Sequence, residues 1–102
     1  IYGDSGINSS EVYGASKAAV IQMTKYMAVH LADDDIRVNC VSPGGIFADQ
    51  AETFLENYRA KVPAGRMARE DDLVDVVVFL SADASRYITG QNLIVDGGFT
   101  AW

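Results

Sequence analysis

This chain of 102 residues contains a single cysteine, so no disulfide can form within it. Cys40 lies in an apolar run, which is expected of a buried structural thiol and predicts a reducing, cytoplasmic location. His30 is also the only residue of its type. Without a second ligand beside it, we interpret it as a surface or packing residue, and no metal site is expected.

Positive charge is scarce as well. Eight Lys and Arg residues against fourteen Asp and Glu give a formal net charge of -6, and no basic cluster interrupts the acidity. This balance argues against a nucleic-acid partner. The longest apolar runs, such as 76–80, are far too short to cross a bilayer, so no membrane partner is expected. Hydrophobic residues at 49% and charged residues at 22% are typical of a globular protein.

No Gly-x-Gly-x-x-Gly motif occurs in the chain. The chain therefore lacks the glycine-rich phosphate loop that this motif forms between a strand and a helix.

Hydrophobic periodicity and turn residues predict the order helix, strand, helix, strand, which is typical of parallel α/β proteins. The expected elements are a loop over 1–10 offering Ser9 or Ser10 as an N-cap, a helix to about Leu31, an exit turn over 33–35, a strand over 36–41, a short helix over 50–60, a helix from about 70 to 84, and a strand over 92–95. The first helix should pack along one apolar face, formed by Ala19, Val20, Met23, Met27 and Leu31. Residues 46–69 have a looser pattern, and we expect a lid there.

Tyr13 and Lys17 stand four residues apart, which places a phenol and an ammonium on one helix face. A free tyrosine titrates near pH ~10, and an adjacent cation favours its phenolate and lowers that pKa. The pair could therefore exchange a proton with an alcohol or carbonyl oxygen.

Three segments in this order, 13–20, 37–45 and 88–98, resemble the C-terminal half of a short-chain dehydrogenase/reductase. The resemblance runs from about Gly3 to Trp102. It implies the C-terminal part of a Rossmann-like doubly wound parallel sheet, with residues 1–102 as the catalytic and substrate half of a single domain and the nucleotide-binding half absent.

The resemblance also implies roles for particular residues. Tyr13 would be the general acid/base, and Lys17 would lower its pKa and hydrogen-bond the nicotinamide ribose. Pro43, Gly44 and the main chain near Ile46 would line the nicotinamide of NAD or NADP. We do not expect these 102 residues alone to bind the cofactor. Asn39 and the run 96–98 fit the family pattern too, with the architectural role of turn hydrogen bonds and positive-φ glycines.

The chain departs from the family pattern at two positions. Ala48 stands where a threonine is usual, so a hydroxyl contact to cofactor is lost, and Asp49 or Gln50 could substitute for it. The usual catalytic serine falls on the position before Ile1. Ser5, Ser9 and Ser10 are out of register and are interpreted as loop and cap residues.

Two functions follow from this resemblance. The first is an NAD(P)-dependent oxidoreductase that interconverts a secondary alcohol and a ketone on a small-molecule substrate, with a homo-oligomeric parent protein. The ending 96–102 and the turn 45–47 are similar to those of family members that act on sugars or sugar derivatives. The alternative is a catalytically inactive truncated module that self-associates through its helices and an unpaired strand edge. Cofactor binding separates the two.

Overall fold

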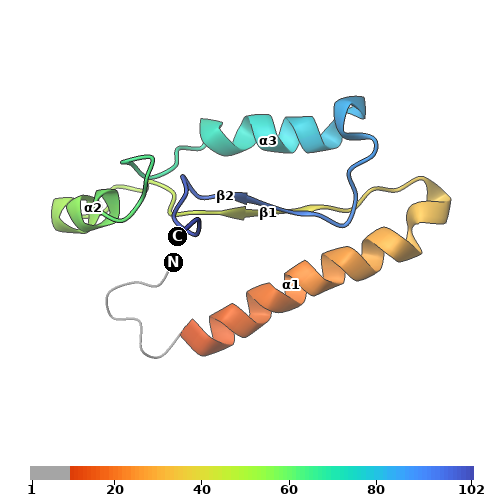
Figure 1. Ribbon diagram of the computed structural model, residues 1–102, viewed down its shortest axis with the longest axis horizontal. Helices are drawn as coiled ribbons and strands as arrows, with labels where there is room; N and C mark the ends of the chain where they lie inside the picture. Colours follow the sequence, from red (N-terminus) through yellow and green to blue (C-terminus); the bar gives the residue numbers. More distant parts are fainter. Residues whose placement is uncertain (1–9) are drawn as a thin grey trace. The chain divides into compact units, whose positions relative to one another are not determined.

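A computed structural model describes residues 10–102, without the side chain of Ser10. The expected loop over 1–9, the cap at Ser9 and the loop position of Ser5 lie outside the described residues. The elements are α1 (Ser10–His30), a 3-10 helix (Ala32–Asp34), β1 (Cys40–Pro43), α2 (Glu52–Arg59), α3 (Asp71–Ser81), a second 3-10 helix (Asp83–Ser85) and β2 (Asn92–Val95) (Figure 1).

The strands β1 and β2 are hydrogen-bonded neighbours in a parallel two-stranded sheet, which confirms the expected α/β class. β2 has the bounds that the sequence predicts. β1 begins at Cys40 instead of at position 36, because the preceding backbone bonds to a turn and not to a strand. The Val38 N–H donates to Thr89 Oγ1 at 3.1 Å, and the Val38 carbonyl accepts from the Gly90 N–H at 2.7 Å.

The chain divides into two compact units. Among the described residues, the first unit combines 10–40 with 85–93, and the second unit combines 41–84 with 94–102.

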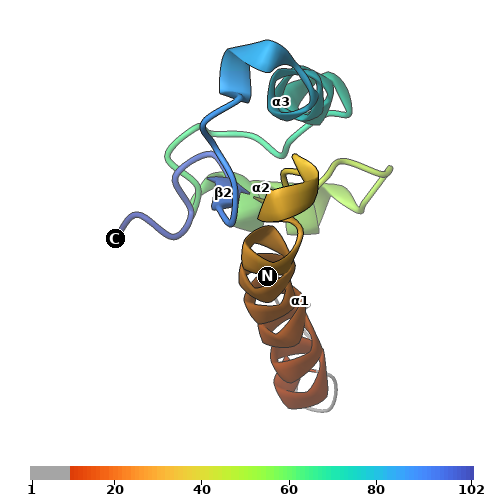
Figure 2. The ribbon, with the colours of Figure 1, turned by 90° about the vertical axis from the view of Figure 1, so that its right-hand side faces the viewer.

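The first unit is dominated by α1, an uninterrupted helix of 21 residues (Figures 1 and 2). Its buried residues are Thr24 and Ala28, and a Cβ on Gly90 would lie 3.4 Å from the Ala28 Cβ. The expected packing along a whole apolar face is wrong for this chain. The side chains of Val20, Met23 and Met27 are 45%, 56% and 39% exposed. Small side chains therefore make the close contact, and the larger apolar ones remain uncovered within these residues.

The acidic turn after α1 is exposed, as the sequence predicts. Its last residue, Asp35, takes the left-handed conformation with φ 57°. This conformation ends the 3-10 helix and turns the chain toward β1.

The second unit holds the hydrophobic core of the described residues, formed by Leu55, Tyr58, Val62 and Met67, with Phe54 and Phe99 packed against it. Five of these six side chains come from the segment 46–69, so the expectation that this segment is a lid and not core is wrong. The reason is that α2 buries one side of its two turns, and the chain then returns beside β1 through a parallel bridge between Ile46 and Ala68.

The helix α3 belongs to the second unit and is shorter than predicted, because Ala82 is extended with ψ 165° and ends it. Leu73, Val76 and Leu80 are half-buried on one face, whereas Val77 is 52% exposed.

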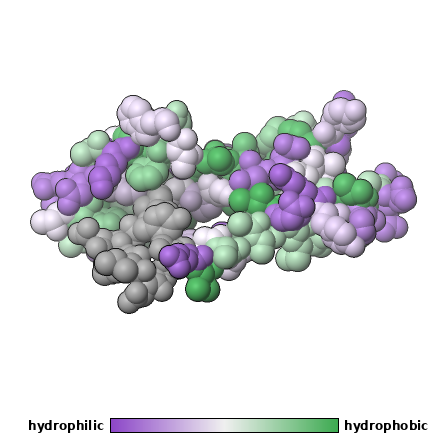
Figure 3. Space-filling model, turned by 60° about the horizontal axis from the view of Figure 1, so that its bottom comes forward, coloured by the Kyte–Doolittle hydropathy of each residue, from purple (hydrophilic) through white to green (hydrophobic). Residues whose placement is uncertain are grey.

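Figure 3 shows hydrophobic residues open to view between hydrophilic ones on the face that it presents. Within residues 10–102 no helix combines the length and the apolar character that a membrane span requires.

Candidate functional site

The predicted pair on α1 is present in the first unit. The Lys17 Nζ lies 5.3 Å from the centroid of the Tyr13 ring, over its face. The ring is 52% exposed, and Ser16 Oγ donates to the Tyr13 carbonyl at 2.7 Å. An ammonium in this position is attracted to the aromatic face and brings a positive charge next to the phenol. The four-residue spacing therefore brings the ammonium next to the phenol ring, as the sequence predicts.

Pro43 is the last residue of β1, and Gly44 follows it directly, in the second unit. The Gly44 N–H donates to the Val95 carbonyl at 2.9 Å. A Cβ at Gly44 would lie 2.8 Å from the Asp96 Cα, which is backbone and cannot give way. Glycine is therefore needed here for the close approach of two strand ends.

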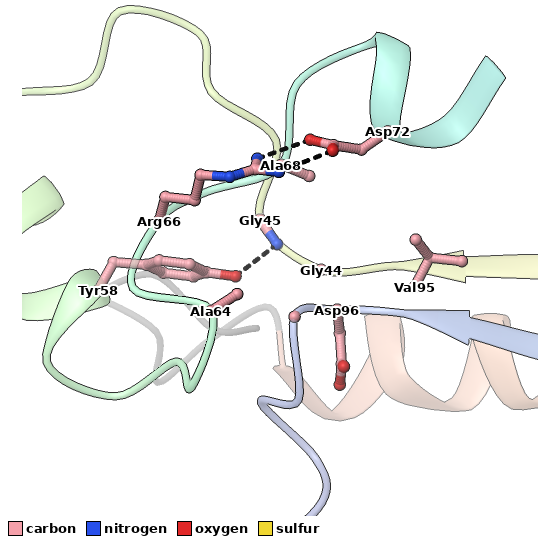
Figure 4. A pocket seen from close by; sticks show the side chains of 10 residues that line it. Gly44, Gly45, Tyr58, Ala64, Arg66, Ala68, Asp72, Val95 and Asp96 are labelled. Atoms are coloured by element: carbon pink, nitrogen blue, oxygen red, sulfur yellow. Dashed lines mark hydrogen bonds and ion pairs between the residues drawn. The ribbon is translucent and has the colours of Figure 1, made fainter. Parts of the chain in front are cut away.

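Gly45 is held from both sides by the core of the second unit. Its N–H donates to Tyr58 Oη at 2.8 Å, and its carbonyl accepts from the Ala68 N–H at 2.9 Å (Figure 4). Tyr58 is 5% exposed, and its ring stacks with those of Phe54 and Phe99 at centroid distances of 6.2 and 5.9 Å. Sequence reasoning missed this role for Tyr58, although its place on the apolar side of α2 was a signal of burial.

The side chain of Gln50 makes two hydrogen bonds to the backbone just beyond Gly45. Gln50 Nε2 donates to the Ile46 carbonyl at 3.0 Å, and Gln50 Oε1 accepts from the Ala48 N–H at 2.8 Å. Asp49 has φ 53°, a left-handed conformation that folds the loop back on itself. Of the two residues that could stand in for the missing threonine, Gln50 is the one whose side chain bonds this loop.

A cavity of about 200 Å³ opens in the second unit where its two strands end. Its lining residues are Gly44, Gly45, Tyr58, Ala64, Arg66, Ala68, Asp72, Val95, Asp96 and Gly97 (Figure 4). Most are small, so backbone forms much of the wall. The cavity lies at the carboxyl ends of parallel strands, where open α/β sheets bind ligands.

An ion pair closes one side of this cavity. Arg66 donates two parallel bonds to the carboxylate of Asp72, at 2.7 and 2.8 Å, and the Arg69 N–H donates a third at 2.7 Å (Figure 4). The Arg66 hydrogen bond is the main cause that holds the pKa of Asp72 well below its usual range, followed by the Arg69 backbone bond. This network joins the end of segment 60–69 to the first turn of α3.

Asp96 and the two glycines after it have the architectural role that the sequence predicts. Asp96 accepts from Thr100 Oγ1 at 2.7 Å and from the N–H groups of Gly98 and Thr100, and these bonds, Thr100 Oγ1 first, lower its pKa. Gly97 and Gly98 have φ of 66° and 88°. The turn therefore needs residues that tolerate positive φ.

The remaining polar candidates are also structural. The Asn39 side chain donates to the Ile88 carbonyl at 2.9 Å and accepts from the Gln91 N–H at 3.0 Å. Cys40 is half-buried, and its Sγ donates to Asn92 Oδ1 at 3.4 Å. His30 packs on the ring of Tyr26 at 3.9 Å between centroids. In the part of the chain that the structure describes, no group of side chains suited to a metal ion is found.

The site residues predicted from the sequence thus fall into two groups. Tyr13 and Lys17 lie together in the first unit, and Pro43, Gly44 and Ile46 lie together in the second unit. Two parallel strands connected through helices form the arrangement found in Rossmann-like α/β proteins.

Comparison with known proteins agrees with this class. Residues 1–100 match the family model described as enoyl-(acyl carrier protein) reductase. A 3-oxoacyl-(acyl-carrier-protein) reductase of Thermotoga maritima is 42% identical over 102 residues, which cover 96% of this chain and 40% of that protein. A tropinone reductase homolog of Arabidopsis thaliana is 41% identical over 100 residues, covering 92% of this chain and 38% of the relative.

The crystal structure of a short chain dehydrogenase from Leptospira borgpetersenii, with bound NAD+, superposes with a TM-score of 0.85 at 56% identity. The match covers 88% of this chain and 35% of that one. The chain belongs to the short-chain dehydrogenase/reductase family. It spans 38 to 40% of the length of these two curated relatives.

Proposed function

We propose that the protein is an NAD(P)-dependent oxidoreductase that interconverts a secondary alcohol and a ketone. Residues 1–102 would be the C-terminal catalytic and substrate half of one short-chain dehydrogenase domain. The observation that carries the proposal is the position of the Lys17 ammonium over the Tyr13 ring, in a chain of this family.

The proposed chemistry uses Tyr13 for the proton and the cofactor for the hydride. When bound, the nicotinamide supplies the hydride for carbonyl reduction or accepts it in alcohol oxidation. During reduction the Tyr13 hydroxyl gives its proton to the substrate oxygen, and during oxidation the phenolate takes that proton back. The Lys17 cation stabilises the negative charge that develops on the phenol oxygen. The exposure of the Tyr13 ring leaves room for a substrate oxygen.

The turn after β1 fits the nicotinamide end of such a cofactor. The Ile46 carbonyl and the Ala48 N–H already bond a primary amide, that of Gln50, so their donor and acceptor suit the carboxamide of nicotinamide. Pro43, Gly44 and Ile46 would line that ring, and Lys17 would bond the ribose. Because residues 1–102 contain no glycine-rich phosphate loop, these contacts serve the nicotinamide end alone.

The substrate would be a small alcohol or carbonyl compound, in line with the reductase names of the relatives. A sugar or sugar derivative is the finer proposal, supported by the resemblance of the segments 45–47 and 96–102. A cytoplasmic location is the finer proposal, supported by the presence of a single, half-buried cysteine, Cys40.

A homo-oligomer is the second proposal, supported by the uncovered apolar face of α1. Val20, Met23 and Met27 are each more than a third exposed, although they share one helical face. The same observation favours the alternative function, a self-associating module without catalysis. The intact mass of the purified protein under denaturing conditions tests this alternative: a mass near 11.0 kDa supports it, and more than twice that mass supports the enzyme.

The main test is the Tyr13→Phe variant of the complete protein. We expect turnover of a ketone with NADH or NADPH to fall about 100-fold or more, because general acid–base catalysis contributes at least that much. The cofactor dissociation constant, measured by NAD(P)H fluorescence, should stay nearly the same. Tyr87→Phe is the matched control, since Tyr87 is 101% exposed. Turnover that survives Tyr13→Phe would remove Tyr13 from the mechanism.

A further inference from the structure

The main-chain groups of residues 45–48 are of two kinds: some are bonded to the core of the second unit, and others are bonded to a solvent-exposed side chain. The Gly45 N–H and carbonyl are bonded to buried Tyr58 and to Ala68, and the Phe47 N–H donates to the Ala68 carbonyl at 2.8 Å. These bonds fix the backbone to the core of the second unit. The Ile46 carbonyl and the Ala48 N–H are bonded instead by the side chain of Gln50, through contacts that are exposed to solvent.

The group that satisfies these two positions is a primary amide, with one donor and one acceptor used at once. The carboxamide of nicotinamide has the same atoms in the same arrangement. The loop also follows the carboxyl end of a parallel strand, where ligands of open α/β sheets bind. Resting on the proposed function, we propose that Gln50 is an internal mimic of the cofactor carboxamide, which the cofactor displaces from Ile46 and Ala48 when it binds.

The local structure allows this exchange. Gln50 reaches back through a single tight turn, made by the left-handed Asp49, so its side chain can swing away without moving the backbone that Ala68 and Tyr58 hold. Ala48 has no hydroxyl to offer the cofactor in compensation. Molecules with Gln50 in place cannot bind the carboxamide. The apparent dissociation constant is therefore the intrinsic one divided by the fraction of molecules in which Gln50 has moved away.

The test measures NADH binding by fluorescence titration of the complete protein and its Gln50→Ala variant. We expect the NADH dissociation constant to fall about five-fold, the size that the loss of one or two exposed hydrogen bonds implies. ADP-ribose, which lacks nicotinamide, should bind both proteins equally. Gln50→Met, which keeps the length of the side chain but cannot replace the amide at the Ile46 carbonyl and the Ala48 N–H, should also bind NADH more tightly and serves if the alanine variant is poorly folded.

Gln91→Ala is the matched control, because Gln91 also bonds a main-chain carbonyl through its amide, that of Thr89 at 3.1 Å. It should leave NADH binding unchanged. Unchanged NADH binding in Gln50→Ala would overturn the proposal, and weaker binding would overturn it too, by making Gln50 a support of the loop. A wild-type protein that binds neither NADH nor ADP-ribose would contradict the proposed function itself.

Discussion

Tyr58 places a single hydroxyl where the backbone turns out of β1. The hydroxyl accepts the Gly45 N–H at 2.8 Å in a site where the tyrosine is 5% exposed. A Cβ at Gly45 would lie 2.8 Å from the Tyr58 ring, so the two residues are fitted to each other. One phenol therefore determines the course of the turn that would carry the nicotinamide contacts.

Replacing Tyr58 by Phe tests this contact at the level of one atom. The ring and its stacking are kept, but the Gly45 N–H loses its acceptor in a part-buried position. We expect the free energy of unfolding to fall by about 1–3 kcal/mol, as for other unsatisfied buried donors. Urea denaturation of the complete protein measures it, with Tyr87→Phe as the exposed control. A loss as small as that of the control would show that the hydroxyl is dispensable.

Sequence reasoning located the predicted proton-transfer pair, but not the side chains that hold the loop after β1. The Tyr13 and Lys17 pair follows from helical periodicity, because residues four apart share a face. Tyr58 and Gln50 act on backbone atoms through a loop whose path has no periodicity. Gln50 reaches the Ile46 carbonyl only because Asp49 takes a left-handed conformation. Tyr58 reaches the Gly45 N–H only because α2 lies beside the turn that follows β1.

At the scale of elements, α3 is fixed at its first turn by the ion pair of Asp72 with Arg66. The helix has no buried residue and its cap residue makes no side-chain cap bond, so this network is a principal local tie of its N-terminus. The acidic residues of this first turn, Asp71 and Asp72, also suit the positive end of the helix dipole. The sequence could not reveal Arg66 as the partner of Asp72, because that contact depends on how segment 60–69 turns.

The pH dependence of stability should reflect this pair. The pKa of Asp72 is depressed in the folded protein, so its contribution is present above the unfolded pKa of about 4 and is lost as pH falls toward the folded pKa. We expect Asp72→Asn to flatten the loss of melting temperature between pH ~5 and pH ~2. Calorimetry across that range measures it. Asp75→Asn, an exposed position on the same helix, should keep the wild-type slope, and an equally steep slope in Asp72→Asn would contradict the assignment.

The elements themselves were largely predictable. The order of helices and strands and the bounds of β2 follow from apolar patterning. The prediction of a lid over 46–69 was wrong because two of its apolar residues, Leu55 and Tyr58, stand three positions apart on one side of α2 and are buried there. Patterning over eight residues is too short to distinguish a core helix from a surface one.

At the scale of the whole molecule, α1 presents an apolar face that nothing in residues 10–102 covers fully. We expect Met23→Lys to shift the complete protein toward smaller species, because a charge at a buried contact is costly to desolvate. Sedimentation velocity measures this. Val29→Lys is the control, since Val29 is 73% exposed and lies on another side of the helix. An unchanged sedimentation coefficient in Met23→Lys would exclude this face from the interface.

The hydrogen bonds of Asn39 have a consequence for the order of folding. They join it to Ile88 and Gln91, which lie 49 and 52 residues further along the chain. Contacts at such separations are closed late, since the intervening chain must lose its entropy before they form. A local helix such as α1 forms from neighbours alone. We therefore expect the pairing of the two strands to be the slow step of folding. The Asn39 hydrogen bonds should form only after the crossover between the strands has folded.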